Sequence, residues 1–104
     1  MTEGFYILIL PSIHFVMKVE KDALAAGVAV ELVPTPRQIS SDCGMAVKFQ
    51  GRDLDWVLRE MKNPGMPEGL LYRSGEEGNL EFLGPAKEYG SAPLPNPPET
   101  RSIK

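Results

Sequence analysis

The chain has 104 residues, with 11 Lys and Arg against 14 Asp and Glu, and 42% of it is apolar, which suits one small globular domain. Its net charge of −3 argues against a nucleic-acid binder, because such proteins present a basic face or stripe. The longest apolar run, from Phe5 to Pro11, is too short to cross a bilayer and lacks the basic start of a signal peptide. The one cysteine excludes an internal disulfide and a zinc site built from several thiolates. We therefore expect no metal, no cofactor and a reducing, cytoplasmic setting.

The first predicted elements are a buried strand and a helix. Residues 5–10 are continuously apolar and rich in β-branched and aromatic side chains, as in a strand covered on both faces. Pro11 ends this strand, and Ser12 is a suitable N-cap for a helix over residues 13–26. Gly27 fits the left-handed position just past the helix end.

One face of this helix is predicted to pack on the sheet. Its apolar members on a helical wheel are Ile13, Val16, Met17, Ala23 and Leu24. Glu20 falls in the middle of the same face, which is unusual for a residue that carries a charge.

Three or four more strands and a second helix follow. Residues 28–33 and 45–49 are predicted strands, separated by a loop that ends at Gly44. Asp53 is a candidate cap for the second helix, whose apolar face comprises Leu54, Val57, Leu58 and Met61. Residues 69–73 read as another strand, and residues 79–83 as a possible fifth.

The order βαββαβ predicts an α+β fold of the ferredoxin-like type, with both helices on one face of a mainly antiparallel sheet. We place the domain at residues 1–84, with its core at 5–73, and a Pro-rich tail at 85–104 that is extended or disordered. Because the first strand is apolar throughout, the other face of the sheet must also be covered. A homodimer is the preferred explanation, and a folded-back tail is the alternative.

This topology predicts the position of the only thiol. In a split βαβ arrangement the third strand lies antiparallel between the first two, so the end of the first strand meets the start of the third. Cys43, just before the third strand, should then lie beside the first turn of the first helix, whose N–H groups carry about half a positive charge. We expect a thiol at that position to have a pKa below its usual value of about 8.5. His14 lies on that turn, and Arg37 at the other end of the loop adds positive charge.

The loop around Cys43 is polar and small. Ser40, Ser41 and Asp42 are turn formers, and Gly44 leaves room for a substrate or partner to approach the sulfur. The candidate catalytic residues are Cys43 and His14. The candidate binding residues are Ser12, Arg37, Ser40, Ser41 and Gly44.

Four segments resemble those of small bacterial proteins described as selenium/sulfur carrier protein-like. They are residues 6–10, Pro11-Ser12-Ile13-His14, Glu20-Lys21 and, most specifically, Pro34-Thr35-Pro36-Arg37-Gln38-Ile39-Ser40-Ser41-Asp42-Cys43-Gly44. The resemblance covers residues 5–73. It implies a thiol carrier that takes sulfur or selenium from a desulfurase-like donor protein and gives it to an acceptor protein. It also implies that the carrier cysteine is Cys43, and it describes group transfer rather than a turnover enzyme.

Two other functions stay open. A lone cysteine is often a small buried hydrophobe, and ferredoxin-like domains serve many unrelated functions. In one alternative, the helix N-terminus and Arg37 bind a small anion in a regulatory module, and Cys43 is incidental. In the other, the chain is a protein-interaction domain whose Pro-rich tail docks to a partner.

Overall fold

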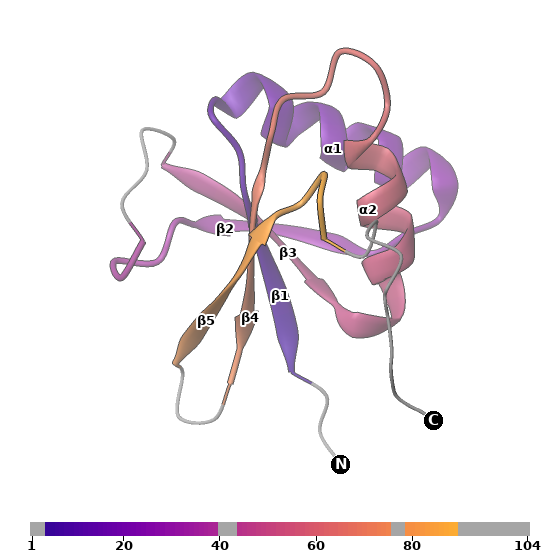
Figure 1. The fold of residues 1–104 in the computed structure, drawn as a ribbon. Helices are drawn as coiled ribbons and strands as arrows, with labels where there is room; N and C mark the ends of the chain where they lie inside the picture. Colours follow the sequence, from indigo (N-terminus) through magenta and orange to yellow (C-terminus); the bar gives the residue numbers. More distant parts are fainter. Residues whose placement is uncertain (1–3, 40–43, 76–78, 90–104) are drawn as a thin grey trace.

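A computed structural model describes residues 4–39, 44–75 and 79–89 and gives the chain two α-helices and a five-stranded sheet (Figure 1). The elements in chain order are β1 (Phe5–Ile9), α1 (Ile13–Ala26), β2 (Val30–Pro34), β3 (Met45–Gln50), the short 3₁₀ helix η1 (Gly51–Asp53), α2 (Leu54–Met61), β4 (Leu70–Ser74) and β5 (Leu80–Pro85). Each predicted element is present, and α1 has the predicted ends, while the ends of the strands differ from the prediction by two residues at most.

The sheet has the order β2-β3-β1-β4-β5, and every neighbouring pair is antiparallel. The α+β, ferredoxin-like prediction is therefore confirmed, and the possible fifth strand extends the sheet beside β4. Phe5 pairs with Gln50 and Leu8 with Val47, so the end of β1 and the start of β3 lie at the same end of the sheet. Both helices lie on one side of the sheet in Figure 1.

The main core lies between the sheet and the helices. Alternate residues of β1 point to opposite faces, so Leu8 and Leu10 pack on the helices. The other buried members of this cluster include Val16, Val19, Val47, Phe49, Val57, Leu58, Met61 and Leu71. For α2, the predicted apolar face is confirmed, because Val57, Leu58 and Met61 are buried and Leu54 packs against them.

The predicted inner face of α1 is wrong by part of a turn. The residues that pack on the sheet are Val16, Val19 and Ala23, and α1 lies over β2 and β3. Ile13, Met17 and Leu24 are instead 47, 57 and 72% exposed. Glu20 explains the rotation, because centring the predicted face on the sheet would bury its carboxylate without a partner. In the observed orientation Glu20 lies at the margin and is half-buried.

The cap residues of the helices lie where they were predicted, but only the C-terminal cap of α1 makes the expected hydrogen bonds. Gly27 has a φ of 74°, and the N–H of Val28 donates to the carbonyl oxygen of Ala23 at 2.8 Å, which is a Schellman ending. Ser12 and Asp53 occupy the N-cap positions of α1 and α2, yet neither side chain makes a capping hydrogen bond.

The sheet face opposite the helices, which we call the open face, carries a second apolar cluster. Ile7, Ile9 and Ala46 are its buried strand residues, and Ile39, from the loop after β2, packs onto them and is only 7% exposed. Half-buried neighbours surround this cluster: Phe5, Val33, Leu70, Tyr72 and Leu80. The chain thus covers part of the open face with its own loop. The predicted homodimer stays a prediction.

Packed structure continues beyond the boundary predicted at residue 84. Ala86 is fully buried, and its N–H donates to the carbonyl oxygen of Gly69 at 2.7 Å. The Lys87 ammonium donates to the carbonyl oxygen of Met66 at 2.6 Å, and Tyr89 packs against the main core. The body therefore reaches Tyr89, and the rest of the predicted tail lies outside the described residues. None of the described helices is long and apolar enough to span a membrane.

Candidate functional site

The loop of residues 35–44, which we call the Cys43 loop, is fastened to the body near both ends. The N–H of Thr35 donates to the carbonyl oxygen of Gly44 at 3.0 Å, which closes the base of the loop. The N–H of Ile39 donates to the carbonyl oxygen of Pro36 at 3.0 Å, and the Ile39 side chain is buried on the open face. Residues 40–43 therefore connect a buried anchor to the first residue before β3.

Four of the seven predicted site residues lie within the described part of the chain. Ser12 is half-buried, and His14, Arg37 and Gly44 are exposed. No heavy atom of the described residues lies within 4 Å of a Cβ added at Gly44. The remaining candidates, Cys43, Ser40 and Ser41, lie outside the described residues, as does Asp42.

The structure brings only part of this set to one place. Ser12 and Gly44 lie at the same end of the sheet, because β1 ends and β3 begins there. His14 contacts Phe15 edge-on, with 5.1 Å between ring centroids. Among the described residues, neither His14 nor Arg37 makes an ion pair. The relation of His14 and Arg37 to the thiol thus stays a prediction.

The first turn of α1 is well suited to an anion. The carbonyl oxygen of Ser12 accepts hydrogen bonds from the N–H groups of Phe15 and Val16, at 3.2 and 3.3 Å. The Ser12 hydroxyl makes no capping bond, and the first turn contains no acidic residue. The positive end of the helix dipole is therefore not met by a carboxylate of that turn, and this favours a negative group nearby.

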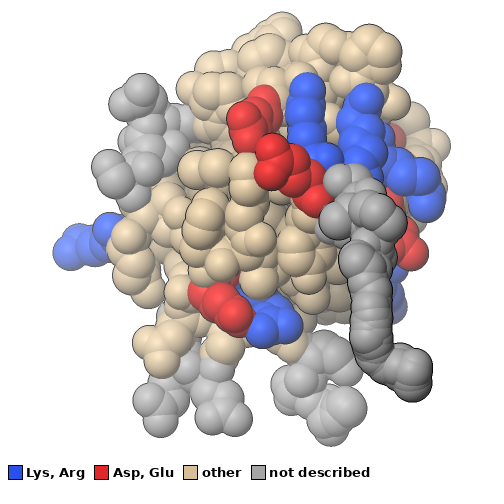
Figure 2. Space-filling model, in the orientation of Figure 1, with Lys and Arg blue, Asp and Glu red and all other residues tan. Residues whose placement is uncertain are grey.

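Charges of both signs are mixed on the surface around these elements. Figure 2 shows basic side chains gathered over the helical side, with acidic side chains beside them. On the lower part of the same view an acidic group lies against a basic one. Among the described residues, Arg73 and Glu81 form an ion pair across β4 and β5. The view presents no face of one sign, in keeping with the small net charge of −3.

One buried ionisable residue was missed by the sequence prediction. Glu60 of α2 is only 7% exposed. Its Oε2 atom has no hydrogen-bond partner in the described part of the chain, while the Asn63 amide donates to Oε1 at 3.4 Å. Burial raises the pKa of Glu60 to about 7, and the neighbouring Asp22 carboxylate of α1 adds to the rise. Interaction with Glu60 lowers the pKa of Asp22, which also pairs with Lys18 at 3.1 Å. The available signal was the position of Glu60, three residues after Val57 beside the apolar face of α2.

No group of three or more His, Cys, Asp and Glu side chains within the described ranges is arranged to hold a metal ion.

Comparison with known proteins identifies a family. A search of curated proteins and a search of solved structures gave no match. The model of one protein family, described as "Putative Se/S carrier protein-like", matches residues 5–73. This match begins at β1, ends within β4 and includes the whole Cys43 loop. Because it covers more than half of the 104 residues, the chain belongs to the Se/S carrier protein-like family.

Proposed function

We propose that this protein carries sulfur or selenium on Cys43 and passes it from a donor protein to an acceptor protein. The observation that carries this proposal is the family match, which spans the chain's only cysteine. The anchored loop supports it, because Ile39 and the Thr35–Gly44 hydrogen bond restrain the chain on both sides of that cysteine. A carrier benefits from such restraint, since a loop held at its ends loses less entropy when it meets a partner.

The proposed transfer is thiol–persulfide exchange. The Cys43 thiolate attacks the outer sulfur of a donor persulfide, the donor's S–S bond breaks, and the donor leaves as a thiolate. A new S–S bond then joins Cys43 to the transferred sulfur, with no external oxidant or reductant. Attack by an acceptor thiolate on the same outer atom returns the Cys43 thiolate. A selenopersulfide donor follows the same steps with selenium as the outer atom.

The first turn of α1 and two side chains are assigned supporting roles. The uncapped N–H groups near Ser12, and the Arg37 guanidinium, stabilise the thiolate and the outgoing persulfide anion. His14 passes a proton to or from these anions. Ser40, Ser41 and Gly44 shape the approach of the partner. A donor of the desulfurase type and a reducing, cytoplasmic setting suit this chemistry.

Mass measurement tests the proposal directly. Wild-type protein incubated with a persulfide donor is expected to gain the mass of one sulfur atom, and with a selenopersulfide donor the mass of one selenium atom. Dithiothreitol should remove that mass, because a thiol reduces a persulfide. Wild type with its only cysteine already alkylated, and Cys43→Ser, are the controls and should gain nothing. Unmodified wild-type mass, or an equal gain in Cys43→Ser, contradicts the carrier function.

The rate of Cys43 alkylation against pH tests the electrostatic part. We expect a midpoint clearly below the usual thiol value of about 8.5, because a helix N-terminus and a nearby cation favour the thiolate. Arg37→Gln should raise the midpoint, whereas Arg59→Gln, which removes an exposed cation on α2, should not. A wild-type midpoint at or above 8.5 would show that the loop does not activate the sulfur.

A further inference from the structure

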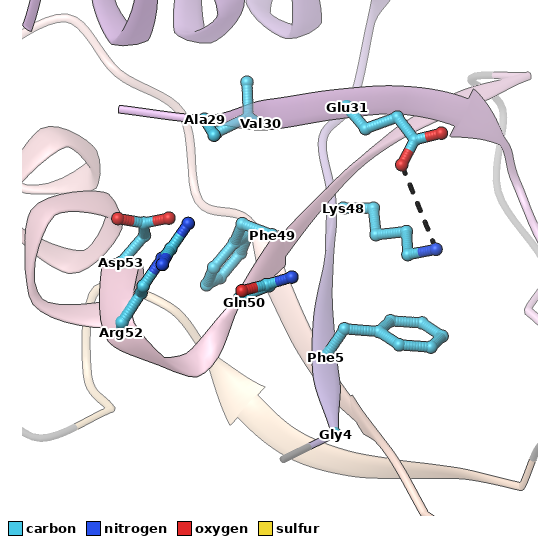
Figure 3. A pocket seen from close by; sticks show the side chains of 10 residues that line it. All are labelled: Gly4, Phe5, Ala29, Val30, Glu31, Lys48, Phe49, Gln50, Arg52 and Asp53. Atoms are coloured by element: carbon cyan, nitrogen blue, oxygen red, sulfur yellow. Dashed lines mark ion pairs between the residues drawn. The ribbon is translucent and has the colours of Figure 1, made fainter. Parts of the chain in front are cut away.

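A hollow of about 440 Å³ opens at the end of the sheet that is opposite to the Cys43 loop. Its walls come from the start of β1, the start of β2, the end of β3 and η1 (Figure 3). Ile39 covers the other end of the open face, so this part of the face is left uncovered by that loop. We propose that the hollow binds a small organic carboxylate, a function beyond the sulfur or selenium transfer proposed above.

Lys48 is the central cation of the hollow. It lies on β3, an inner strand, and its ammonium stands 4.3 Å from the centroid of the Phe5 ring. The ammonium is also 3.9 Å from Glu31, whose side chain is 67% exposed, so water weakens this pair. Contact with the Phe5 ring restricts the conformations of the Lys48 side chain. Most of the three N–H donors of its ammonium group stay available to a ligand.

A second cation stands on the opposite wall. Arg52 of η1 is exposed and makes no ion pair with a described residue. In Figure 3 the Gln50 amide lies between Arg52 on one side and Lys48 on the other. Two cations and an amide donor around one hollow favour a carboxylate, which accepts several charge-assisted hydrogen bonds.

The rest of the lining restricts the ligand further. Glu31 and Asp53 also line the hollow, so its formal charge is balanced and a multiply charged anion such as phosphate is disfavoured. The Phe5 ring and Ala29 offer apolar surface for an organic body. A flat or branched monocarboxylate meets both requirements.

Benzoate is the probe, observed by two-dimensional NMR of the whole chain. We expect saturable shifts of the backbone signals of Phe5, Lys48, Gln50 and Arg52. Lys48→Gln and Arg52→Gln should each weaken binding about tenfold, the usual effect of losing one charge-assisted hydrogen bond. Arg59→Gln and Cys43→Ser should bind as wild type does. The same spectra report whether each variant is folded.

Two further probes separate the alternatives. Benzyl alcohol has a similar body without the charge, and inorganic phosphate has the charge without the body. Equal binding of benzyl alcohol, tighter binding of phosphate, or no saturation by benzoate overturns the proposal. Cys43→Ser retains the hollow, so the outcome here is independent of the outcome of the sulfur-transfer experiment.

Discussion

The free energy of unfolding should fall by as much as about 3 kcal/mol as the pH rises from 4.5, the ordinary pKa of Glu60, past its native pKa of about 7. The native state holds the Glu60 proton because the carboxyl group is buried beside Asp22. Unfolding releases that group to water, where it ionises more readily. The native state therefore binds more protons than the unfolded state in this pH window, and stability decreases as pH rises through it.

Asp22 sets the acid side of the same profile. The native state lowers the pKa of Asp22 from 3.8. Asp22 therefore adds to the free energy of unfolding above pH 3.8, and this stabilisation is lost as the pH falls below that value. Stability from this pair is therefore greatest near pH 4 to 5, where Asp22 is ionised and Glu60 is protonated. Lys18 helps to hold Asp22 in its charged form.

Urea unfolding of Glu60→Gln across this range tests the assignment. The amide resembles the protonated carboxyl group, so the variant should be about 1–3 kcal/mol more stable than wild type at pH 8 and nearly equal at pH 4.5. Glu68→Gln removes an exposed carboxylate of the same length and should keep the wild-type slope. If the free energy of unfolding of Glu60→Gln depends on pH as steeply as that of wild type, a group other than Glu60 causes the pH dependence.

Replacing Ile39 with alanine is expected to destabilise the fold by about 2 to 4 kcal/mol. Ile39 is the loop residue that packs onto Ile7, Ile9 and Ala46. Its truncation leaves a cavity and exposes part of an apolar sheet face to water. Ile39→Val removes a single methylene and should cost about 0.5–1.5 kcal/mol.

Leu24→Ala is the matched control for Ile39→Ala. Leu24 is 72% exposed on α1, so its truncation should change the free energy of unfolding by less than about 0.5 kcal/mol. Equal losses for the two alanine variants would mean that the loop does not cover the open face in solution. Chemical denaturation at one pH measures all three variants together.

The order of strands and helices was predictable because its signals are local. Pro11 ends β1, Gly27 ends α1 in a left-handed conformation, and alternating or helical periodicity marks the elements between them. The order βαββαβ predicts that β3 lies antiparallel between β1 and β2, as observed. The place of β5 beside β4 was not predicted.

The candidate site was predictable only in part. The positions of Ser12 and Gly44 at one end of the sheet follow from topology, and the family resemblance follows from the motifs around Cys43. That Ile39 anchors the loop could not be read from the chain, because an isolated isoleucine between polar residues has no periodicity to indicate a packing partner.

The fold class, the helix ends and the family resemblance could be predicted from the residues alone, since each depends on short segments of the chain. Three features became visible only in the folded chain: the side of α1 that packs, the burial of Glu60 near Asp22, and the hollow lined by Lys48 and Arg52. These features depend on residues distant in sequence. A periodic pattern marks an apolar arc on one element, but only the neighbouring elements determine which part of that arc loses its contact with water.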